Sequence, residues 1–214
     1  MQVFLSLKKI KMKIICVGMN YSEHIREMGN TFPNEPILFL KPETALLTKN
    51  KPFFLPDFSQ NVQYELEVLV KINKVGKCIS ERFAHTYYDE IGLGIDFTAR
   101  DIQKQCIAEG KPWDIAKGFD NSAVVSNFIN KNQFDDIQKL QFYLEKNGQK
   151  VQNGDTSDMI FNINRLISII SNYYTLKIGD IIFTGTPFGV GEVKIGDHLQ
   201  GYLETYKMMD FYVK

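Results

Sequence analysis

The sequence predicts an α+β domain in which β-strands predominate. Short segments rich in Val, Ile, Leu and Phe are separated by Gly, Pro, Asn and Asp, the pattern of strands joined by turns. These segments outnumber the helical ones and do not alternate with them regularly, which argues against a doubly wound parallel sheet. A chain of 214 residues is also long enough to bury a substantial core.

We expect a single folded domain over residues 12–214, beginning with the strand "KIICVG". Residues 1–11 are expected to be an N-terminal extension with little structure. Their lysines follow a short apolar stretch, which is the wrong order for a secretory signal.

Eight segments have the composition of strands. In chain order they are KIICVG, PILFLK, ELEVLVKI, IGLGID, LQFYLE, DIIFTG, HLQGYLE and DFYVK. Asn147-Gly148 lies between two alternating segments and predicts a β-hairpin. Gly179-Asp180 and Gly196-Asp197 predict tight turns before later strands.

Three segments have helical periodicity. "YSEHIREM" could form two turns with Ser22 as its N-cap, and a second helix is expected from Thr98 to a stop at Gly110. The third is "FNINRLISIISNYY". Its apolar stripe consists of Ile163, Leu166, Ile167 and Ile170.

Composition and charge narrow the class of protein. Hydrophobic residues make up 44% and charged residues 23%, and the formal net charge is zero. There is no basic arm or acidic tail, so neither nucleic acid nor a membrane surface is expected as a partner. Three scattered cysteines without metal-ligand spacing suggest a reducing compartment, and we expect a cytoplasmic protein.

Two glutamates share one predicted strand. In the segment Gln63–Val70, Glu65 and Glu67 point to one side of an extended chain. The opposite, apolar side consists of Tyr64, Leu66, Val68 and Val70. Neighbouring carboxylates raise each other's pKa unless a cation neutralises them. The two glutamates could therefore face water, pair with lysines across the strand, or hold a divalent ion.

Asp96 favours the divalent ion without excluding the other interpretations. It ends the short apolar strand "GLGID" directly before a predicted helix, and Gly92 and Gly94 allow that backbone to pack closely. As a third oxygen ligand, Asp96 would complete a carboxylate set suited to Mg²⁺, Mn²⁺ or Ca²⁺. Alternatively, Asp96 could simply cap the following helix.

Seven motifs in order resemble one family of enzymes. They are GMNYSEHIREM, PILFLKPETALL, YELEVLV, GIDFTARDIQ, GKPWDIAKGFD, NGDTSDMIF and GDIIFTGTPFGVG. From about Lys13 to the C-terminus the chain resembles the fumarylacetoacetate hydrolase family, and most of all its short single-domain branch. The resemblance implies a mostly β, α+β fold with layered mixed sheets and few helices, and it implies a homodimer.

The resemblance also implies roles for individual residues. Mg²⁺ or Mn²⁺ would be bound by Glu65, Glu67 and Asp96. A catalytic dyad would consist of His24 and Glu27, within a mobile lid. The family's site lysine corresponds to Lys117, Arg100 and Gln103 correspond to polar groups beside the metal ligands, and Thr186 corresponds to the loop that receives the substrate carboxylate.

The function implied is chemistry on a small 2-oxo acid through a metal-bound enolate. We favour hydrolysis of a C–C bond in an acylpyruvate, with decarboxylation of oxaloacetate as a further activity. An isomerase of the 2-hydroxyhepta-2,4-diene-1,7-dioate type is the main alternative. A protein that keeps the fold as a non-catalytic dimeric binding module is an alternative from another class.

Overall fold

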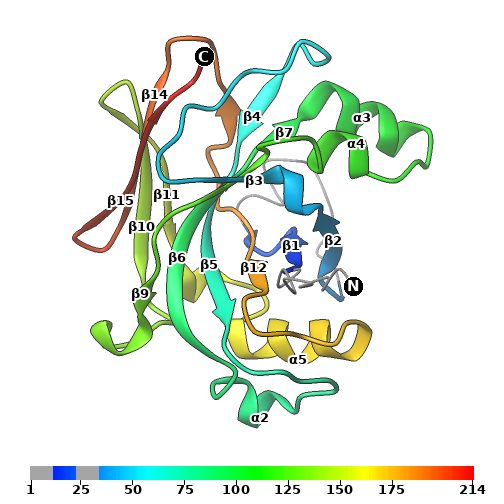
Figure 1. The fold of residues 1–214 in the computed structure, drawn as a ribbon, viewed down its shortest axis with the longest axis vertical. Coiled ribbons are helices and arrows are strands. Elements are labelled where there is room, and N and C mark those ends of the chain that lie inside the picture. Colours follow the sequence, from blue (N-terminus) through cyan, green and yellow to red (C-terminus); the bar gives the residue numbers. More distant parts are fainter. Residues whose placement is uncertain (1–11, 23–33) are drawn as a thin grey trace, which may run out of the picture.

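Strands predominate in the structure, a computed structural model that describes residues 12–22 and 34–214 (Figure 1). The helices are α2 (Glu81–Ala84), α3 (Arg100–Ala108), α4 (Asp114–Lys117) and α5 (Ile163–Tyr173). The strands are β1 (Ile14–Gly18), β2 (Ile37–Lys41), β3 (Leu46–Thr48), β4 (Val62–Tyr64), β5 (Leu66–Ile72), β6 (Tyr88–Asp96), β7 (Thr98–Ala99), β8 (Ala123–Val125), β9 (Ile129–Asn130), β10 (Gln141–Lys146), β11 (Gln149–Asp155), β12 (Ile181–Phe183), β13 (Gly191–Glu192), β14 (His198–Leu203) and β15 (Tyr206–Tyr212).

The largest sheet is mixed. Its strands follow the order β2-β1-β12-β5-β6-β8-β3, and β9 also pairs with β6. The β1–β12 and β3–β8 pairs are parallel, whereas the other pairs are antiparallel. The central strands β5, β6 and β12 are buried along nearly their whole length. This central part of the sheet is therefore a rigid support for side chains at the strand ends.

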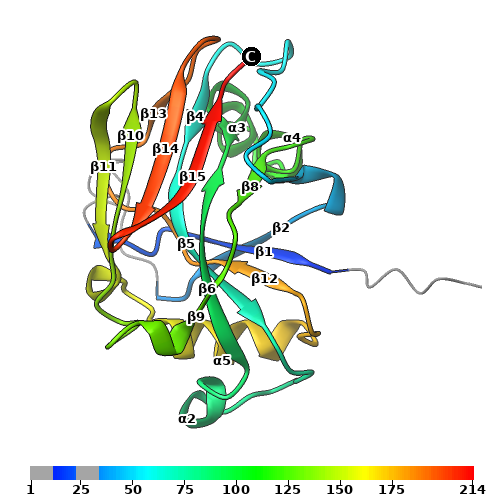
Figure 2. The same cartoon turned by 60° about the vertical axis from the view of Figure 1, so that its left-hand side comes forward.

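A second, antiparallel sheet packs against the first. Its order is β11-β10-β14-β15, and Figure 2 shows it beside β5 and β6. The main hydrophobic core includes Val68 and Leu93 of the large sheet and Leu144 and Leu199 of the second. Helix α5 adds its predicted apolar stripe to this core. The two sheets and α5 thus form the layers expected of the fold class, which is confirmed.

Most local predictions are confirmed. All eight predicted strand segments contain a strand, and Asn147-Gly148 connects β10 to β11 with positive φ at both residues, as a type I′ turn requires. The glycines of the two predicted Gly-Asp turns also have positive φ. Among the described residues, no helix is long and apolar enough to cross a bilayer.

The continuous strand predicted over Gln63–Val70 is wrong in one respect, because it is interrupted at Glu65. Before that residue, β4 belongs to a small sheet with β7 and β13, and after it β5 joins the large sheet. The N–H of Leu66 donates to the side-chain oxygen of Gln152 at 2.9 Å. The chain passes between two sheets here, which the local pattern could not reveal.

The helices differ from prediction at two places. The second helix begins at Arg100 rather than Thr98, because Thr98–Ala99 pairs with β4 as the short strand β7. It ends at Ala108, and the chain turns at Gly110, the predicted stop, which has a φ of 63°. Most of the predicted helix "YSEHIREM" lies outside the described residues.

Candidate active site

Three buried carboxylates meet where the small sheet joins the large one. Glu65 lies at the junction of β4 and β5, Glu67 is in β5, and Asp96 ends β6. Antiparallel pairing of β5 with β6 places Leu66 opposite Ile95, so the acids of the two strands are neighbours. One oxygen from each carboxylate lies within 4.8 Å of the others. The predicted convergence of the three acids is therefore present in the fold.

The carboxylates do not face water. Glu65, Glu67 and Asp96 are 5%, 2% and 0% exposed, so the interpretation as a solvated sheet surface is wrong. Asp96 does not cap the following helix either, because no side chain caps the N-terminus of α3. Lysine pairing does occur, but the lysines come from other elements rather than from across the strand pair.

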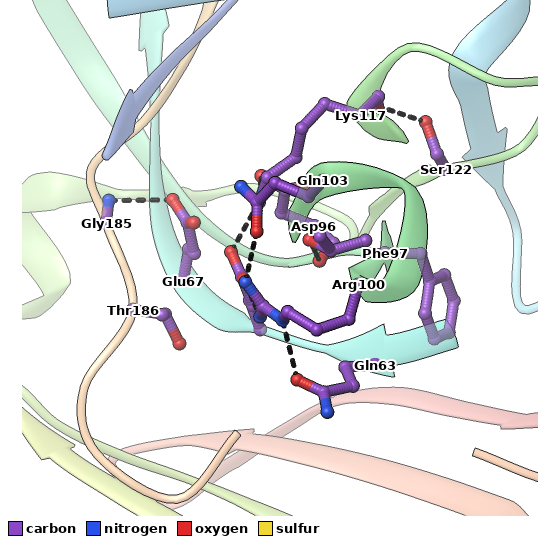
Figure 3. A network of polar contacts seen from close by, with 12 residues as sticks. Gln63, Glu67, Asp96, Phe97, Arg100, Gln103, Lys117, Ser122, Gly185 and Thr186 are labelled. Atoms are coloured by element: carbon purple, nitrogen blue, oxygen red, sulfur yellow. Dashed lines mark hydrogen bonds and ion pairs between the residues drawn. The ribbon is translucent and has the colours of Figure 1, made fainter. Parts of the chain in front are cut away.

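Lys117 bridges two of the acids. Its ammonium group lies 2.6 Å from Oε2 of Glu65 and 2.9 Å from Oδ2 of Asp96. Burial by itself lowers the pKa of Lys117, but the nearby charges of Asp96 and Glu65 outweigh burial and raise it above the ordinary value. Lys117 is therefore a fixed cation inside the site, at the end of α4 (Figure 3).

Lys41 is a second buried cation, which the sequence analysis did not identify. Its Nζ atom lies 2.7 Å from Oδ1 of Asp96, and both side chains are fully buried. The same ammonium also donates to the backbone carbonyl of Lys117 and to Oγ of Ser122, the latter at 3.0 Å. Lys41 ends the apolar strand β2, which is an unusual place for a lysine. A lysine at the end of an apolar strand could have been noticed in the sequence, although nothing near it in the chain indicates that its partner is Asp96.

Arg100 is the third cation, and its orientation is determined by three hydrogen bonds (Figure 3). It donates to Oε1 of Glu65, to the side-chain oxygen of Gln63 at 2.7 Å, and to that of Gln103 at 2.6 Å. Because the amide oxygen of Gln103 is used in this way, its NH₂ group is available as a donor. Arg100 and Gln103 therefore lie beside the carboxylates, where the sequence analysis expected them.

The loop after β12 completes the site. Gly185 has a φ of 101° and donates its N–H to Oε2 of Glu67 at 2.7 Å. The next residue, Thr186, lines the same cavity as the three carboxylates, Arg100, Gln103 and Lys117. The remaining lining residues are mostly apolar. They are Val17, Gly18, Met19, Phe39, Ile107 and Trp113.

The donor set fits a divalent cation. Three carboxylates that converge on one small volume supply the hard oxygen donors that Mg²⁺ and Mn²⁺ prefer. Glu65, Glu67 and Asp96 would hold such an ion. His24 and Glu27, the expected dyad, lie outside the described residues, so their geometry relative to this site stays a prediction.

The fold and the site together define a class of protein with a buried tricarboxylate centre on a mixed β-sheet. The sequence pattern of the family described as "Fumarylacetoacetate (FAA) hydrolase C-terminal" matches residues 13–211. The chain belongs to the fumarylacetoacetate hydrolase family. The resemblance stated from the seven motifs is therefore confirmed.

Individual relatives are similar over nearly the whole chain. The mitochondrial oxaloacetate tautomerase FAHD1 of Bos taurus is 43% identical over 94% of this chain and 91% of its own. The mitochondrial oxaloacetate decarboxylase of Dictyostelium discoideum is 40% identical over 86% and 85%. Among solved structures, fumarylpyruvate hydrolase of Pseudomonas aeruginosa, in complex with Mn²⁺ and pyruvate, has a TM-score of 0.89 at 31% identity and covers 94% and 88%.

We expect Lys41→Met to lower the free energy of unfolding by about 3–5 kcal/mol, because the buried charge of Asp96 would lose one of its two cationic partners. Urea denaturation measures the change. The control is Lys71→Met, which removes an ion pair with Glu90 of similar length, 2.6 Å, at a partly exposed position. That variant should lose about 1 kcal/mol or less. Equal losses in the two variants would contradict the structural role of Lys41.

We expect cation binding to strengthen as pH rises. Burial, followed by the charges of Asp96 and Glu65, raises the pKa of Glu67 well above its ordinary value. Because the folded pKa exceeds the unfolded one, the protonated carboxyl favours the metal-free fold, and this contribution is lost as pH rises through the raised pKa. A metal ligand must lose its proton, so binding should release protons.

Calorimetry in two buffers of different ionisation enthalpy, from about pH 5 to about pH 8, would measure the protons released on binding Mn²⁺. Proton release should diminish towards the upper end of this range. Glu67→Gln is the matched control, because its amide has no proton to release. Binding that is independent of pH throughout would show that Glu67 is already ionised in the metal-free protein.

Proposed function

We propose that this protein is a divalent-cation-dependent enzyme that acts on small 2-oxo acids through the enolate of the substrate. The observation that supports this most directly is the convergence of Glu65, Glu67 and Asp96 in one cavity with Arg100 and Lys117. A cation bound to the three acids would act as a Lewis acid towards the ketone oxygen and share the enolate charge. Relatives acting on oxaloacetate and fumarylpyruvate support the substrate class.

The charges of the site favour a dianionic substrate. The three carboxylates are matched by three described cations, Lys41, Lys117 and Arg100. A divalent ion that displaces the proton of Glu67 and binds the three ionised carboxylates leaves two positive charges in a largely buried cavity. A dicarboxylate such as oxaloacetate would neutralise them, whereas a monocarboxylate would leave one charge uncompensated. Oxaloacetate therefore fits the electrostatics better than acetylpyruvate.

Each polar residue has a role in this proposal. The ammonium group of Lys117, held protonated by its two acidic partners, would stabilise negative charge that develops on the substrate oxygen. The free NH₂ group of Gln103 and the guanidinium of Arg100 would orient the substrate. Thr186 would donate its hydroxyl to the substrate carboxylate, the position that the family resemblance assigns to it.

Tautomerisation of oxaloacetate is the reaction best supported by the relatives, and the sequence analysis did not consider it. It moves a proton from the enol oxygen to carbon 3, and His24 oriented by Glu27 would be the group that transfers it. Decarboxylation requires only loss of CO₂ to form the enolate. Both reactions need the same cation and the same charge stabilisation, so one site can support both.

Acylpyruvate hydrolysis is the second candidate, supported by His24 and Glu27 in the sequence and by the fumarylpyruvate hydrolase structure. His24 would take a proton from water, and the hydroxide would attack the distal carbonyl. The C–C bond would break with its electron pair moving to the pyruvate enolate, which is then protonated. The diene isomerase and the non-catalytic binding module stay as alternatives.

The partners and location are also part of the proposal. A homodimer is expected from family membership. The three cysteines, two buried and one exposed, form no disulfide, which suits a reducing compartment. The cytoplasm is the location we expect from the sequence, although the bovine and Dictyostelium relatives are mitochondrial. Fractionation of cells that express the chain would distinguish the two.

We expect turnover of oxaloacetate that requires Mg²⁺ or Mn²⁺. Enol-to-keto conversion, CO₂ release and acetylpyruvate cleavage would be measured in parallel, each with added cation and with chelator. Glu65→Gln, which keeps the size of the side chain but removes its charge, should abolish cation binding and all three activities. Activity that persists in chelator would refute the metal, and a lack of all three would favour the binding module.

We expect His24→Ala to lower acylpyruvate hydrolysis and oxaloacetate tautomerisation by about 10²–10⁴-fold, because both need a positioned proton-transfer group. Decarboxylation should be affected much less, since it needs no base. His85→Ala is the control, because His85 is exposed on the surface. An equal loss of all three activities would contradict the assignment of His24 as the base.

A further inference from the structure

Gln152 contacts two parts of the candidate site, namely the backbone between Glu65 and Glu67 and the loop that contains Thr186. It does so from a different sheet than that of Glu67. It lies in β11, the edge strand of the second sheet, and is 2% exposed. Its amide oxygen accepts from the N–H of Leu66 at 2.9 Å, and its amide nitrogen donates to Oγ1 of Thr186 at 2.9 Å and to the carbonyl of Pro187 at 3.1 Å. Leu66 lies between the two glutamates.

The orientation of this amide is determined by its backbone partners. The N–H of Leu66 can only donate and the carbonyl of Pro187 can only accept, so a flipped amide would oppose like groups at both contacts. The NH₂ group of Gln152 therefore faces Pro187 and Thr186. An amide nitrogen cannot accept a hydrogen bond, which means that Thr186 accepts from Gln152.

This contact leaves the hydroxyl hydrogen of Thr186 available to another acceptor. Thr186 lines the cavity that contains the three carboxylates, Arg100 and Lys117. A hydroxyl that accepts on one side and lies at the cavity on the other can donate to an anionic oxygen placed there. In this way the amide of Gln152 makes Thr186 a donor.

The loop that contains Thr186 is held closely on β11 at two further positions. A Cβ atom at Gly154 would lie 2.9 Å from Cγ of Pro187, and one at Gly189 would lie 2.6 Å from the carbonyl oxygen of Val151. These contacts hold the loop close to β11, whereas Gln152 also contacts the segment between Glu65 and Glu67. It therefore relates Thr186 to the proposed metal ligands.

We propose that Gln152 is a positioning residue for recognition of the substrate carboxylate. It orients the hydroxyl of Thr186 as a donor into the cavity and sets the separation between that hydroxyl and the pair Glu65 and Glu67. This inference rests on the proposed function, since it assigns Thr186 to a 2-oxo acid. It assigns no contact between Gln152 itself and the substrate.

Gln152→Glu tests the proposal with a side chain of nearly the same shape. An ionised carboxylate there can accept from Leu66 but opposes the carbonyl of Pro187, and it accepts the hydroxyl hydrogen of Thr186, turning it away from the cavity. A protonated carboxyl has one hydrogen in place of the two of the amide, so it cannot satisfy both Thr186 and Pro187. In either protonation state, the glutamate side chain cannot donate to both Thr186 and Pro187 as the amide of Gln152 does.

We expect Gln152→Glu to raise KM for oxaloacetate, and Kd for pyruvate on the Mn²⁺-loaded protein, by about 10- to 100-fold. The change in kcat should be much smaller, and the affinity for Mn²⁺ without pyruvate should be unchanged. Binding of acetylacetone, which chelates the ion as its enolate but has no carboxylate, should also be retained. A general loss of packing would weaken the binding of oxaloacetate, pyruvate, Mn²⁺ and acetylacetone together.

A double-mutant cycle distinguishes action through Thr186 from other effects. Thr186→Val removes the hydroxyl, so the double variant should bind pyruvate about as weakly as Thr186→Val alone. Ser171→Ala is the matched structural control, because it removes a buried hydroxyl of α5 that accepts the N–H of Ile79 at 2.8 Å. Helix α5 lies at the opposite end of the fold from α3 and α4, which contribute residues to the cavity lining (Figure 1). Its stability should fall without a change in KM.

Two results would overturn the inference. The first is that Gln152→Glu has the same KM and pyruvate Kd as Ser171→Ala. The second is that the double variant weakens pyruvate binding by the product of the two single-variant factors, as expected for independent residues. Should Gln152→Glu fail to fold, Gln152→Met, of similar length and without the amide, replaces it in every measurement. Pyruvate binding without any turnover would refute the proposed reactions only, whereas lack of pyruvate binding by the Mn²⁺-loaded wild-type protein would refute both.

Discussion

The site depends on the balance of charge inside a buried volume. Glu65, Glu67 and Asp96 are almost completely excluded from water, and unpaired carboxylates in such surroundings would cost several kcal/mol each. Lys41, Lys117 and Arg100 compensate Glu65 and Asp96 through ion pairs, whereas Glu67 accepts the N–H of Gly185 and its raised pKa favours the neutral form. The three cations come from β2, α4 and the start of α3, so these elements cannot move independently of the acids without exposing an unpaired charge.

The topology of the large sheet makes this balance possible. Pairing of β5 with β6 brings Asp96 beside the glutamates, and the backbone N–H of Asp96 donates to the carbonyl of Glu65 at 2.9 Å. β12 lies on the other side of β5, so the loop after it reaches Glu67 through Gly185. The interruption at Glu65 belongs to the same arrangement, since it is where the chain leaves the small sheet.

The sequence alone predicted those features of the site whose signals lie close together in the chain or belong to recurrent motifs. Alternation placed Glu65 and Glu67 on one side of a strand, and the end of a buried strand made Asp96 unusual, so the sequence alone identifies the three acids. The motifs of the family then located Arg100, Gln103, Lys117 and Thr186, which the structure brings into one cavity. These signals are local or belong to recurrent motifs.

The contributions of Lys41 and Gln152 were missed for the opposite reason. Each contacts the site from a strand far away in the sequence, and each is selected by hydrogen bonds to backbone groups that no side-chain pattern encodes. The passage of the chain between two sheets at Glu65 was missed likewise, because residues 63–70 form an alternating pattern without any local break. Sequence reasoning therefore finds groups of unusual chemistry more readily than the groups that hold them in place.

The compensating cations have a second consequence for the proposed chemistry. In the protein alone, Lys117 and Arg100 are paired with Glu65 and Asp96, and the raised pKa of Glu67 favours its neutral form. A divalent ion shared by the same carboxylates would leave the positive charge of Lys117 and Arg100 largely uncompensated, and the potential inside the cavity would become attractive to an anion. Binding of the ion and of an anionic substrate should therefore be coupled, because each lowers the electrostatic cost of the other. The cations that allow Glu65 and Asp96 to be buried in their ionised form are thus the same groups that favour a dianionic 2-oxo acid.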